Sequence, residues 1–281
     1  RALSQNFLRD AAAADGFLHT VRVDPDQLCL EVGAGEGVLT ERLATRCPRL
    51  IAYEIDPHLA SKLEARLGRR PGAEVIAGDF LAARPPAEPF QVVGNVPFSL
   101  TSAIVDWCLQ APRITTATII TQLEYAKKRA GSFSRWSLLT VSTWPEFSWE
   151  LRGSIPRRQF RPVPRVDAGI LLLTRRAEPL LTGGRRTAYS RLVELGFTGV
   201  GGTLYASLSR RYPGPALARA FDAAGLDRRT VVAFVHPQQW IGLCAELEPR
   251  SGRGYAAVPG RQSGRRGPAD STPRRAAAGN A

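Results

Sequence analysis

The chain has 281 residues, and 38 lysines and arginines against 25 acidic residues give it a net charge of +13 at pH 7. Hydrophobic residues make up 44% of the sequence, which is enough for a sizeable core and excludes wholesale disorder. No apolar run approaches the roughly 20 residues that span a bilayer, and no signal-peptide stretch opens the chain. The four cysteines form neither a CxxC motif nor a Cys/His cluster, which argues against structural zinc and against a disulfide scaffold. We therefore expect free core thiols in a cytoplasmic protein; they are Cys29, Cys47, Cys108 and Cys244.

Short apolar runs alternate with amphipathic stretches between residues 28 and 125, which predicts βαβ units around a parallel sheet. The predicted strands are 28–32, 50–54, 74–77, 91–94 and 117–122. The predicted helices are 38–47, one through Leu59, Leu63 and Leu67, 101–109, and one that carries Lys127, Lys128 and Arg129. Two later segments, 147–155 and 168–175, are expected to close the sheet as an antiparallel hairpin around a loop, 156–167, with three prolines and four arginines.

Strand patterns end near residue 178, and Gly and Pro signals then separate four predicted helices. These helices are 187–196, 203–212, 215–224 and 237–247. We therefore expect an α/β domain at 1–177, a small helical domain at 178–248 and a disordered basic tail at 249–281. Seven arginines and one aspartate give the tail +6 of the net charge, which leaves +7 on the folded body and indicates a polyanionic partner.

Residues 31–37 (EVGAGEG) place glycines in the pattern GxGxG between a predicted strand and a helix, where backbone approaches a ligand closely. The spacing differs from the GxGxxG of dinucleotide folds, which favours a nucleoside with a small polar tail over a pyrophosphate. Glu54 and Asp79 follow the next two strands and can accept from ribose hydroxyls and from an adenine amine. Each feature alone is also compatible with a tight turn or a solvated acid. Together, at successive strand ends, they indicate S-adenosylmethionine (SAM).

The fourth strand ends in residues 95–98 (NVPF). The Asn95 amide oxygen and a backbone carbonyl can accept from an exocyclic amine and direct its lone pair at a methyl donor. Pro97 stiffens this backbone, and Phe98 offers a ring on which a flipped base gains about 1–3 kcal/mol by stacking. Alone, the segment could be a proline turn with a core aromatic. After a SAM-type glycine turn, it indicates methylation of an adenine N6, a cytosine N4 or a glutamine amide.

Six segments, in order and spacing, resemble the Erm methyltransferases, which modify an adenine N6 of large-subunit ribosomal RNA, and more broadly the ribosomal RNA adenine dimethyltransferases. They are 4–8 (SQNFL), 31–37, 53–56 (YEID), 78–80 (GDF), 94–98 (GNVPF) and 160–167 (FRPVPRVD). The resemblance runs from about residue 3 to 247. It implies an α/β fold, with a Rossmann-like SAM-dependent methyltransferase sheet in 1–177 and a small all-helical C-terminal domain. Many members have Ile-Pro-Tyr at 96–98, so the Phe98 ring would act by stacking and not by proton transfer.

The resemblance also implies roles for individual residues. Asn6 and Leu8 would close over the cofactor, Gly33 would lie under its methionine portion, and Asn95 would bridge cofactor and target amine. The expected cofactor-binding residues are Asn6, Leu8, Gly33, Gly35, Glu54, Ile55, Asp79, Phe80 and Asn95. The expected catalytic residues are Asn95, Pro97 and Phe98. In-line transfer needs no dedicated base, and the three histidines, His19, His58 and His236, lie outside the motifs.

The implied function is SAM-dependent methylation of the N6 amine of a specific adenine in 23S ribosomal RNA, protein-free or in early assembly. This conveys resistance to macrolide, lincosamide and streptogramin B antibiotics. The candidate phosphate contacts are Lys127, Lys128, Arg135, Arg157, Arg158, Arg161, Arg210 and Arg211. Alternatives are a housekeeping small-subunit RNA dimethyltransferase and an idle RNA-binding factor; segments 105–109 and 122–126 and the basic tail favour the resistance branch. We expect a cytoplasmic monomer without a metal or a membrane partner.

Overall fold

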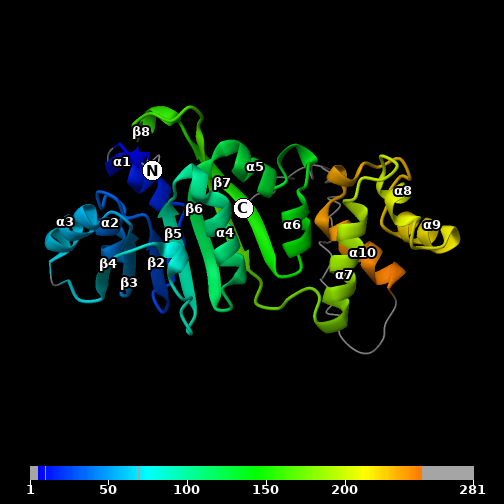
Figure 1. The fold of residues 1–281 in the computed structure, drawn as a ribbon, viewed down its shortest axis with the longest axis horizontal. Coiled ribbons are helices and arrows are strands. Elements are labelled where there is room, and N and C mark those ends of the chain that lie inside the picture. Colours follow the sequence, from blue (N-terminus) through cyan, green and yellow to red (C-terminus); the bar gives the residue numbers. More distant parts are fainter. Residues whose placement is uncertain (1–5, 10, 69, 249–281) are drawn as a thin grey trace, which may run out of the picture.

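A computed structural model describes residues 6–9, 11–68 and 70–248. Its centre is a seven-stranded sheet in the order β4-β3-β2-β5-β6-β9-β7 (Figure 1). The first five are parallel and β9 is antiparallel to both of its neighbours, which confirms the predicted α/β sheet and its closing hairpin. The strands are β2 (Leu28–Val32), β3 (Leu50–Glu54), β4 (Ala73–Ala77), β5 (Phe90–Asn95), β6 (Ile114–Gln122), β7 (Phe147–Ile155) and β9 (Ala168–Arg175).

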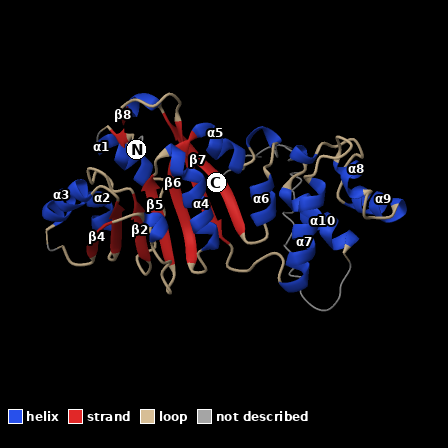
Figure 2. Cartoon of the chain, in the orientation of Figure 1, coloured by secondary structure: helices blue, strands red, loops and turns tan. Residues whose placement is uncertain are grey.

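Helices cover both faces of this sheet, as Figure 2 shows. Because both faces are covered, the central strands are apolar on both sides. In β2, Leu30 points into the core beneath α4 and α5, whereas Cys29 points into the core beneath α1 and α2. Leu63 of α3 packs on the same side as Cys29. The helices are α1 (Ala11–Leu18), α2 (Thr40–Arg46), α3 (Pro57–Leu67), α4 (Thr101–Gln110), α5 (Leu123–Arg129) and α6 (Leu138–Thr143).

The four helices predicted after residue 178 are present, and residues 178–248 contain no strand. They are α7 (Gly183–Gly196), α8 (Leu204–Leu208), α9 (Gly214–Ala223) and α10 (Pro237–Leu247). They enclose a third core around Tyr189, Leu217 and Trp240. α8 begins one residue after and ends four residues before the predicted 203–212. The boundary at 178 stays a prediction, since Val141 of α6 belongs to this core as well.

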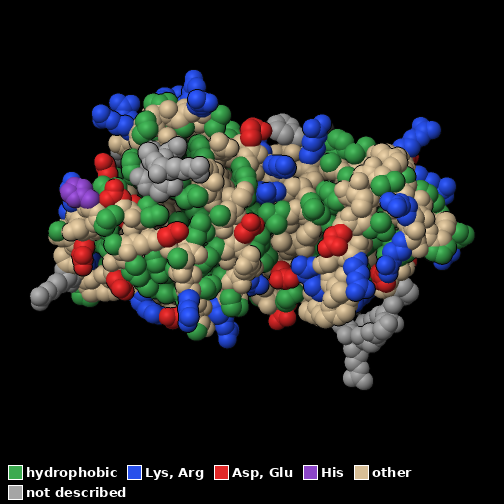
Figure 3. Space-filling model, in the orientation of Figure 1, with side chains coloured by type: hydrophobic (Ala, Val, Ile, Leu, Met, Phe, Trp, Pro, Cys, Tyr) green, Lys and Arg blue, Asp and Glu red, His purple; other side chains and the backbone are tan. Residues whose placement is uncertain are grey.

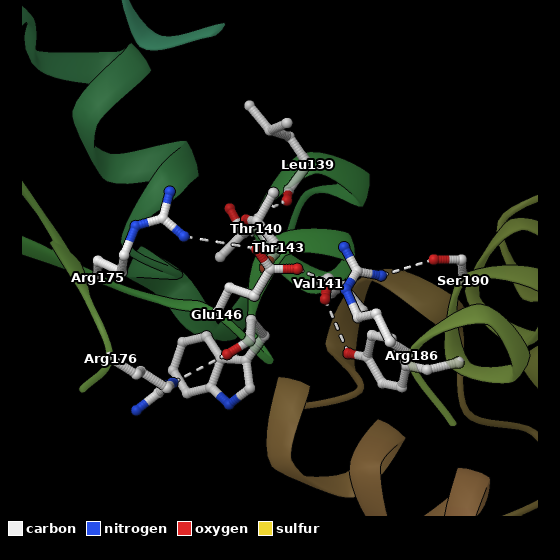
Figure 4. A network of polar contacts seen from close by, with 11 residues as sticks. Leu139, Thr140, Val141, Thr143, Glu146, Arg175, Arg176, Arg186 and Ser190 are labelled. Atoms are coloured by element: carbon white, nitrogen blue, oxygen red, sulfur yellow. Dashed lines mark hydrogen bonds and ion pairs between the residues drawn. The ribbon is translucent and has the colours of Figure 1, made fainter. Parts of the chain in front are cut away.

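Charged side chains join the sheet to the C-terminal helices (Figure 4). Glu146, just before β7, accepts a hydrogen bond from Arg186 Nε of α7 at 2.8 Å and lies 3.7 Å from Arg175 Nη1 of β9. Next to Arg175, Arg176 donates to the Trp144 carbonyl at 3.0 Å. Because these groups are half-buried and each carboxylate oxygen faces a guanidinium, the network ties the two parts of the molecule together.

The prediction of a loop over 156–167 is incomplete. This segment contains a short helical turn, Arg157–Gln159, and a strand, β8 (Phe160–Arg161), which pairs with β1 (Phe7–Leu8). α1 and α6 were also not predicted. A two-residue strand carries no periodicity of its own and forms only when its distant partner is in place.

All four cysteines are buried and free, as expected. Within the described residues, no helix combines the length and the apolar character that crossing a membrane requires. The predicted tail at 249–281 lies outside the described residues.

Candidate functional site

The carboxyl ends of the parallel strands meet at one edge of the sheet. The chain runs outward from β2 to β4 and then returns to β5 on the other side of β2, so the crevice between β2 and β5 is where such folds bind ligands. A pocket opens at this edge, which we call the strand-end pocket. It is lined by Val32, Gly33, Tyr53, Glu54, Ile55, Gly78, Asp79, Phe80, Leu81, Pro97, Leu100 and Ile104.

The glycine turn after β2 has left-handed backbone at Gly33, Gly35 and Gly37, where φ is +73°, +56° and +80°. Such angles are strained for residues with a Cβ atom. The Gly33 amide donates to the Tyr53 carbonyl at 2.9 Å, so the turn is fixed to the end of β3. A Cβ atom on Gly35 would lie 2.6 Å from the Phe7 ring. The sequence therefore keeps this backbone close both to the pocket and to the N-terminal segment.

Glu54 is fully buried at the end of β3 and lines the strand-end pocket. Its Oε2 accepts from the Gly35 amide at 2.6 Å and its Oε1 from the Asp56 amide at 2.9 Å. The carboxylate is therefore held in one orientation, and each oxygen keeps a lone pair for a further donor. Ile55, which is 45% exposed, lies at the rim of the pocket.

Asp79 and Phe80 form another wall of the strand-end pocket. Asp79 is exposed and accepts from the Leu81 amide at 2.9 Å, which fixes its carboxylate at the start of a short helical turn. Phe80 is buried between Tyr53, at 5.5 Å between ring centroids, and Trp107, at 4.4 Å. An acceptor thus lies beside an apolar aromatic wall, which suits a purine that carries an amino group.

A second pocket adjoins the first at Gly33, and we call it the N-terminal pocket. It is lined by Phe7, Leu8, Glu31, Gly33, Ala34, Glu36, Val38, Leu39 and Asn95. Asn95 Nδ2 donates to the Asn6 carbonyl at 2.6 Å. Because a carbonyl can only accept, this bond assigns the two ends of the amide, and Oδ1 is the end that can accept from another group.

Glu31 is a candidate site residue that the sequence analysis did not select. It lies in the middle of buried β2, and neither carboxylate oxygen has a hydrogen-bond partner of good geometry. Burial is the main cause that raises the pKa of Glu31 to about 8; the Thr40 hydroxyl opposes this rise and the Glu54 charge adds to it. A buried carboxyl group without a partner beside a pocket is a candidate for ligand binding. The sequence feature that could have identified Glu31 is a single acidic residue within an otherwise apolar predicted strand.

The structure does not bring every predicted site residue to a pocket wall. Gly35 lies under Phe7, and Phe98 lines neither pocket. The Phe98 ring is half-buried and packs against the core that contains Leu8 and Phe160. Asn6 contributes its backbone carbonyl to the Asn95 amide.

The predicted phosphate contacts fall into separate groups. Arg157, Arg158 and Arg161 are exposed in the 156–167 segment, and Lys and Arg side chains gather above β8 in Figure 3. The Leu123 amide, at the start of α5, donates to the Asp167 carbonyl at 3.0 Å, so the helix with Lys127 and Lys128 begins beside the end of this segment. Lys127 is also paired with Glu124 at 3.0 Å.

The remaining candidates lie elsewhere. The Arg135 guanidinium lies over the Phe234 ring, and Arg211 is paired with Glu248 at 3.4 Å. Arg210 and Arg211 follow α8, which lies at the opposite end of the molecule from α1 and β8 in Figure 1. All three histidines are exposed, and the described residues contain no group of three His, Cys, Asp or Glu that could hold a metal ion.

Comparisons with known proteins agree with this geometry. The family model described as ribosomal RNA adenine dimethylase matches residues 1–248. An rRNA adenine N-6-methyltransferase of Streptomyces fradiae is 55% identical over 89% of this chain and 79% of its own length. The crystal structure of the 23S rRNA methyltransferase ErmE superposes with a TM-score of 0.84 at 51% identity, over 86% of this chain and all of that one. A ribosomal RNA small subunit methyltransferase A of Kineococcus radiotolerans is 35% identical over 81% of this chain and 79% of its own length. The chain belongs to the ribosomal RNA adenine dimethylase family.

Proposed function

We propose that the protein transfers a methyl group from SAM to the N6 amine of a specific adenine in 23S ribosomal RNA. The observation that carries this proposal is the position of Asn95. Asn95 ends β5 and lines the N-terminal pocket together with Gly33, and Gly33 lines the strand-end pocket as well. Asn95 Oδ1 points away from Asn6. An acceptor at this junction can hold a target amine beside a bound methyl donor.

The pockets offer groups that complement each part of SAM. Glu54, held by two backbone amides, would accept from the ribose hydroxyls. Asp79 and Phe80 would contact the adenine, with Ile55 at the rim. Glu31, whose carboxylate oxygens have no partner, would accept from the ammonium of the methionine portion, which Gly33 would underlie. Leu8 and Asn6 would close the N-terminal side. This fit supports SAM as the cofactor.

When bound, SAM supplies a methyl group on a sulfonium sulfur. Asn95 Oδ1 would accept a hydrogen bond from the target N6, and this bond would direct the N6 lone pair at the methyl carbon. Pro97 would limit movement of the backbone beside it. Transfer of this methyl group would form the bond from N6 to carbon as the carbon–sulfur bond breaks, and the methylated amine would release its proton to water. Orientation and exclusion of water account for the rate, since proximity alone can contribute about 7–11 kcal/mol.

Phe98 would stack on the flipped adenine. Its half-buried ring packs against the core that contains Leu8 and Phe160, next to the segment that carries Arg157, Arg158 and Arg161. Phosphates held by these arginines would thus lie near the stacked base. Lys127 and Lys128 would extend the contact along α5. Arg135, Arg210 and Arg211 would contribute at the helical end.

The identity to relatives favours the large-subunit target. The chain is 51% identical to a protein that is a 23S rRNA methyltransferase and 35% identical to a small-subunit enzyme. Methylation of 23S RNA at this adenine would confer resistance to macrolide, lincosamide and streptogramin B antibiotics and would take place in the cytoplasm. The small-subunit reaction remains the second candidate function, because that relative covers 81% of the chain.

The test is to incubate the protein and labelled SAM with protein-free 23S RNA, with 16S RNA and with assembled ribosomes. The modified base is then mapped. We expect label on one adenine of protein-free 23S RNA. Transfer to 16S RNA alone would support the small-subunit enzyme. RNA binding without transfer to any substrate would indicate an idle binding factor.

A further inference from the structure

The two-stranded sheet β1–β8 lies between the arginine-bearing segment 156–167 and the proposed methyl-transfer site. Phe7 pairs with Arg161 and Leu8 with Phe160. The pairing continues one residue further, because the Arg9 amide donates to the Gln159 carbonyl at 2.7 Å. The N-terminal segment therefore has its backbone partner in the segment that we expect to contact RNA.

One face of this small sheet is anchored in the core. Leu8 and Phe160 are buried together with Ile155, and Phe98 packs against the same core. The other face carries Phe7 and Arg161, and the Phe7 ring lies against Gly35 of the glycine turn. A shift of β8 thus reaches both the cofactor-binding turn and the side chain that would stack on the target base.

The small sheet also fixes Asn95. Asn6 immediately precedes β1, and its carbonyl holds Asn95 Nδ2 at 2.6 Å. Only Asn6 and Phe7 separate the Asn95 amide from Arg161 along this path of hydrogen bonds and backbone. The rotamer of the catalytic amide therefore depends on where β1 lies, and β1 depends on β8.

The arginine-bearing segment is itself closed by short polar contacts. The Arg157 amide donates to Asp167 Oδ1 at 2.8 Å, and Arg157 Nη1 donates to the Arg165 carbonyl at 3.3 Å. Arg158 and Arg161 are exposed beside Val163, which is 61% exposed. Cations on an ordered loop next to exposed apolar side chains suit a nucleic-acid backbone with an unstacked base.

We propose that β1–β8 is a positioning element, through which RNA held by segment 156–167 fixes Asn6, Phe7 and Asn95 and thereby tightens the cofactor site. This inference rests on the proposed function. It requires that RNA and cofactor strengthen each other's binding by the same factor, because coupling between two sites is reciprocal. The residues Asn6 and Phe7 position the site and are not themselves catalytic.

The test uses the pair Arg9→Pro and Arg9→Ala in the full chain. Both remove the same charge, but only proline removes the amide that donates to Gln159. The dissociation constant of S-adenosylhomocysteine, which cannot donate a methyl group, is measured with and without a 23S RNA transcript. We expect RNA to tighten binding about tenfold in the wild type and in Arg9→Ala, and to have almost no effect in Arg9→Pro.

Amide hydrogen exchange provides a measurement that needs no variant. In the wild type, RNA should slow exchange at the Arg9 amide, which donates to the Gln159 carbonyl. Methylation of 23S RNA by the wild type without any effect of RNA on cofactor affinity would overturn this inference and leave the proposed function intact. Full coupling in a folded Arg9→Pro protein would also overturn it. Absence of methylation by the wild type would overturn the proposed function and the inference with it.

Discussion

At the residue scale, the proposed chemistry depends on two side chains, one half-buried and one buried. They differ in how many of their polar atoms have a hydrogen-bond partner within the protein. The Asn95 amide has its donor end occupied by Asn6 and its acceptor end directed elsewhere. Glu31 has neither oxygen satisfied. An unsatisfied buried carboxyl group costs stability, so its retention beside a pocket is best explained by a ligand that satisfies it.

Replacing Asn95 by alanine should abolish transfer and, in the absence of RNA, leave cofactor binding nearly unchanged. The variant loses the acceptor for the target amine, whereas Glu54, Asp79 and Phe80 stay in place. We expect a fall in kcat of at least about a hundredfold, in line with the loss of one oriented hydrogen-bonding group in an active site. Single-turnover methylation and calorimetric SAM binding check this. Weak cofactor binding with normal turnover of the bound fraction would contradict the role given to Asn95.

Binding of SAM at pH 7 should release most of one proton from Glu31. With a pKa of about 8 the side chain is mainly protonated in the free protein, and a cationic ammonium beside it would stabilise the ionised form and lower the pKa. Calorimetry in buffers of different ionisation enthalpy measures the released protons. Glu31→Gln, which cannot ionise, should release none.

The pH dependence of stability checks the same group without a ligand. The folded protein holds a proton on Glu31 up to about pH 8, whereas an unfolded glutamate loses it near pH 4.3. The Glu31 contribution to stability is therefore fully present below about pH 4.3 and is lost as the pH rises toward 8. Glu31→Gln should flatten this decline in the unfolding free energy. An unchanged slope would mean that Glu31 is ionised in the folded protein.

At the element scale, the local sequence of the glycine turn predicts its conformation. It does not predict which distant segment packs against it. The spacing of residues 33–37 predicted a turn between β2 and the next helix, and the left-handed angles agree. It gave no sign that Phe7 covers Gly35. Contact between segments so distant in sequence is specified by the whole fold and not by either segment.

Gly35→Ala and Gly183→Ala form a matched pair. Both glycines have nearly the same angle, φ of +56° and +54°, so both variants lose about 1–2 kcal/mol to left-handed strain. Only at Gly35 does the new Cβ atom meet a side chain, Phe7, and Gly183 has open space around it. We expect weaker SAM binding in Gly35→Ala alone, and a larger fall in its melting temperature because the Phe7 ring must shift to admit the Cβ atom. Equal cofactor affinities would show that Phe7 does not contribute to the cofactor site.

The main strands were predictable because apolar runs of five to nine residues carry a signal that both covered faces of the sheet reinforce. The helices after residue 178 were predictable from their spacing and from proline and glycine breaks. β1 and β8 were not, since two residues cannot show a period. Glu31 was missed because an acid in an apolar strand reads as part of the glycine motif, and its lack of a partner is visible only in three dimensions.

At the scale of the whole molecule, electrostatics act in two different ways. Inside, Glu146 joins the sheet to the C-terminal helices through Arg175 and Arg186. Outside, an excess of arginine gives the chain its +13 charge. The first kind of contact is local and half-buried, and the second acts over a Debye length and responds to salt.

Glu146→Gln should lower the free energy of unfolding by about 1 kcal/mol, because both carboxylate oxygens face guanidinium groups and all three side chains are at least two-thirds buried. Glu88→Gln is the control, since Glu88 makes two 2.7 Å bonds to Arg49 but both side chains are about half exposed. We expect a smaller loss there, because water screens exposed pairs. Denaturant titration measures both. Equal losses would mean that burial of the Glu146 network adds nothing.

Deleting residues 249–281 should weaken RNA binding and reduce its salt dependence without lowering the melting temperature. The segment carries +6 of the +13 charge and none of the residues that line the two pockets. Each phosphate contact adds roughly 0.7–0.9 to the slope of log affinity against log salt, so loss of several tail contacts gives a measurable change. A full-length chain with the seven tail arginines replaced by glutamine separates charge from length, and it should behave like the deletion. If instead its salt slope equals that of the wild type, RNA binding is carried by the +7 of residues 1–248 alone, with Arg157, Arg158 and Arg161 as the first residues to test.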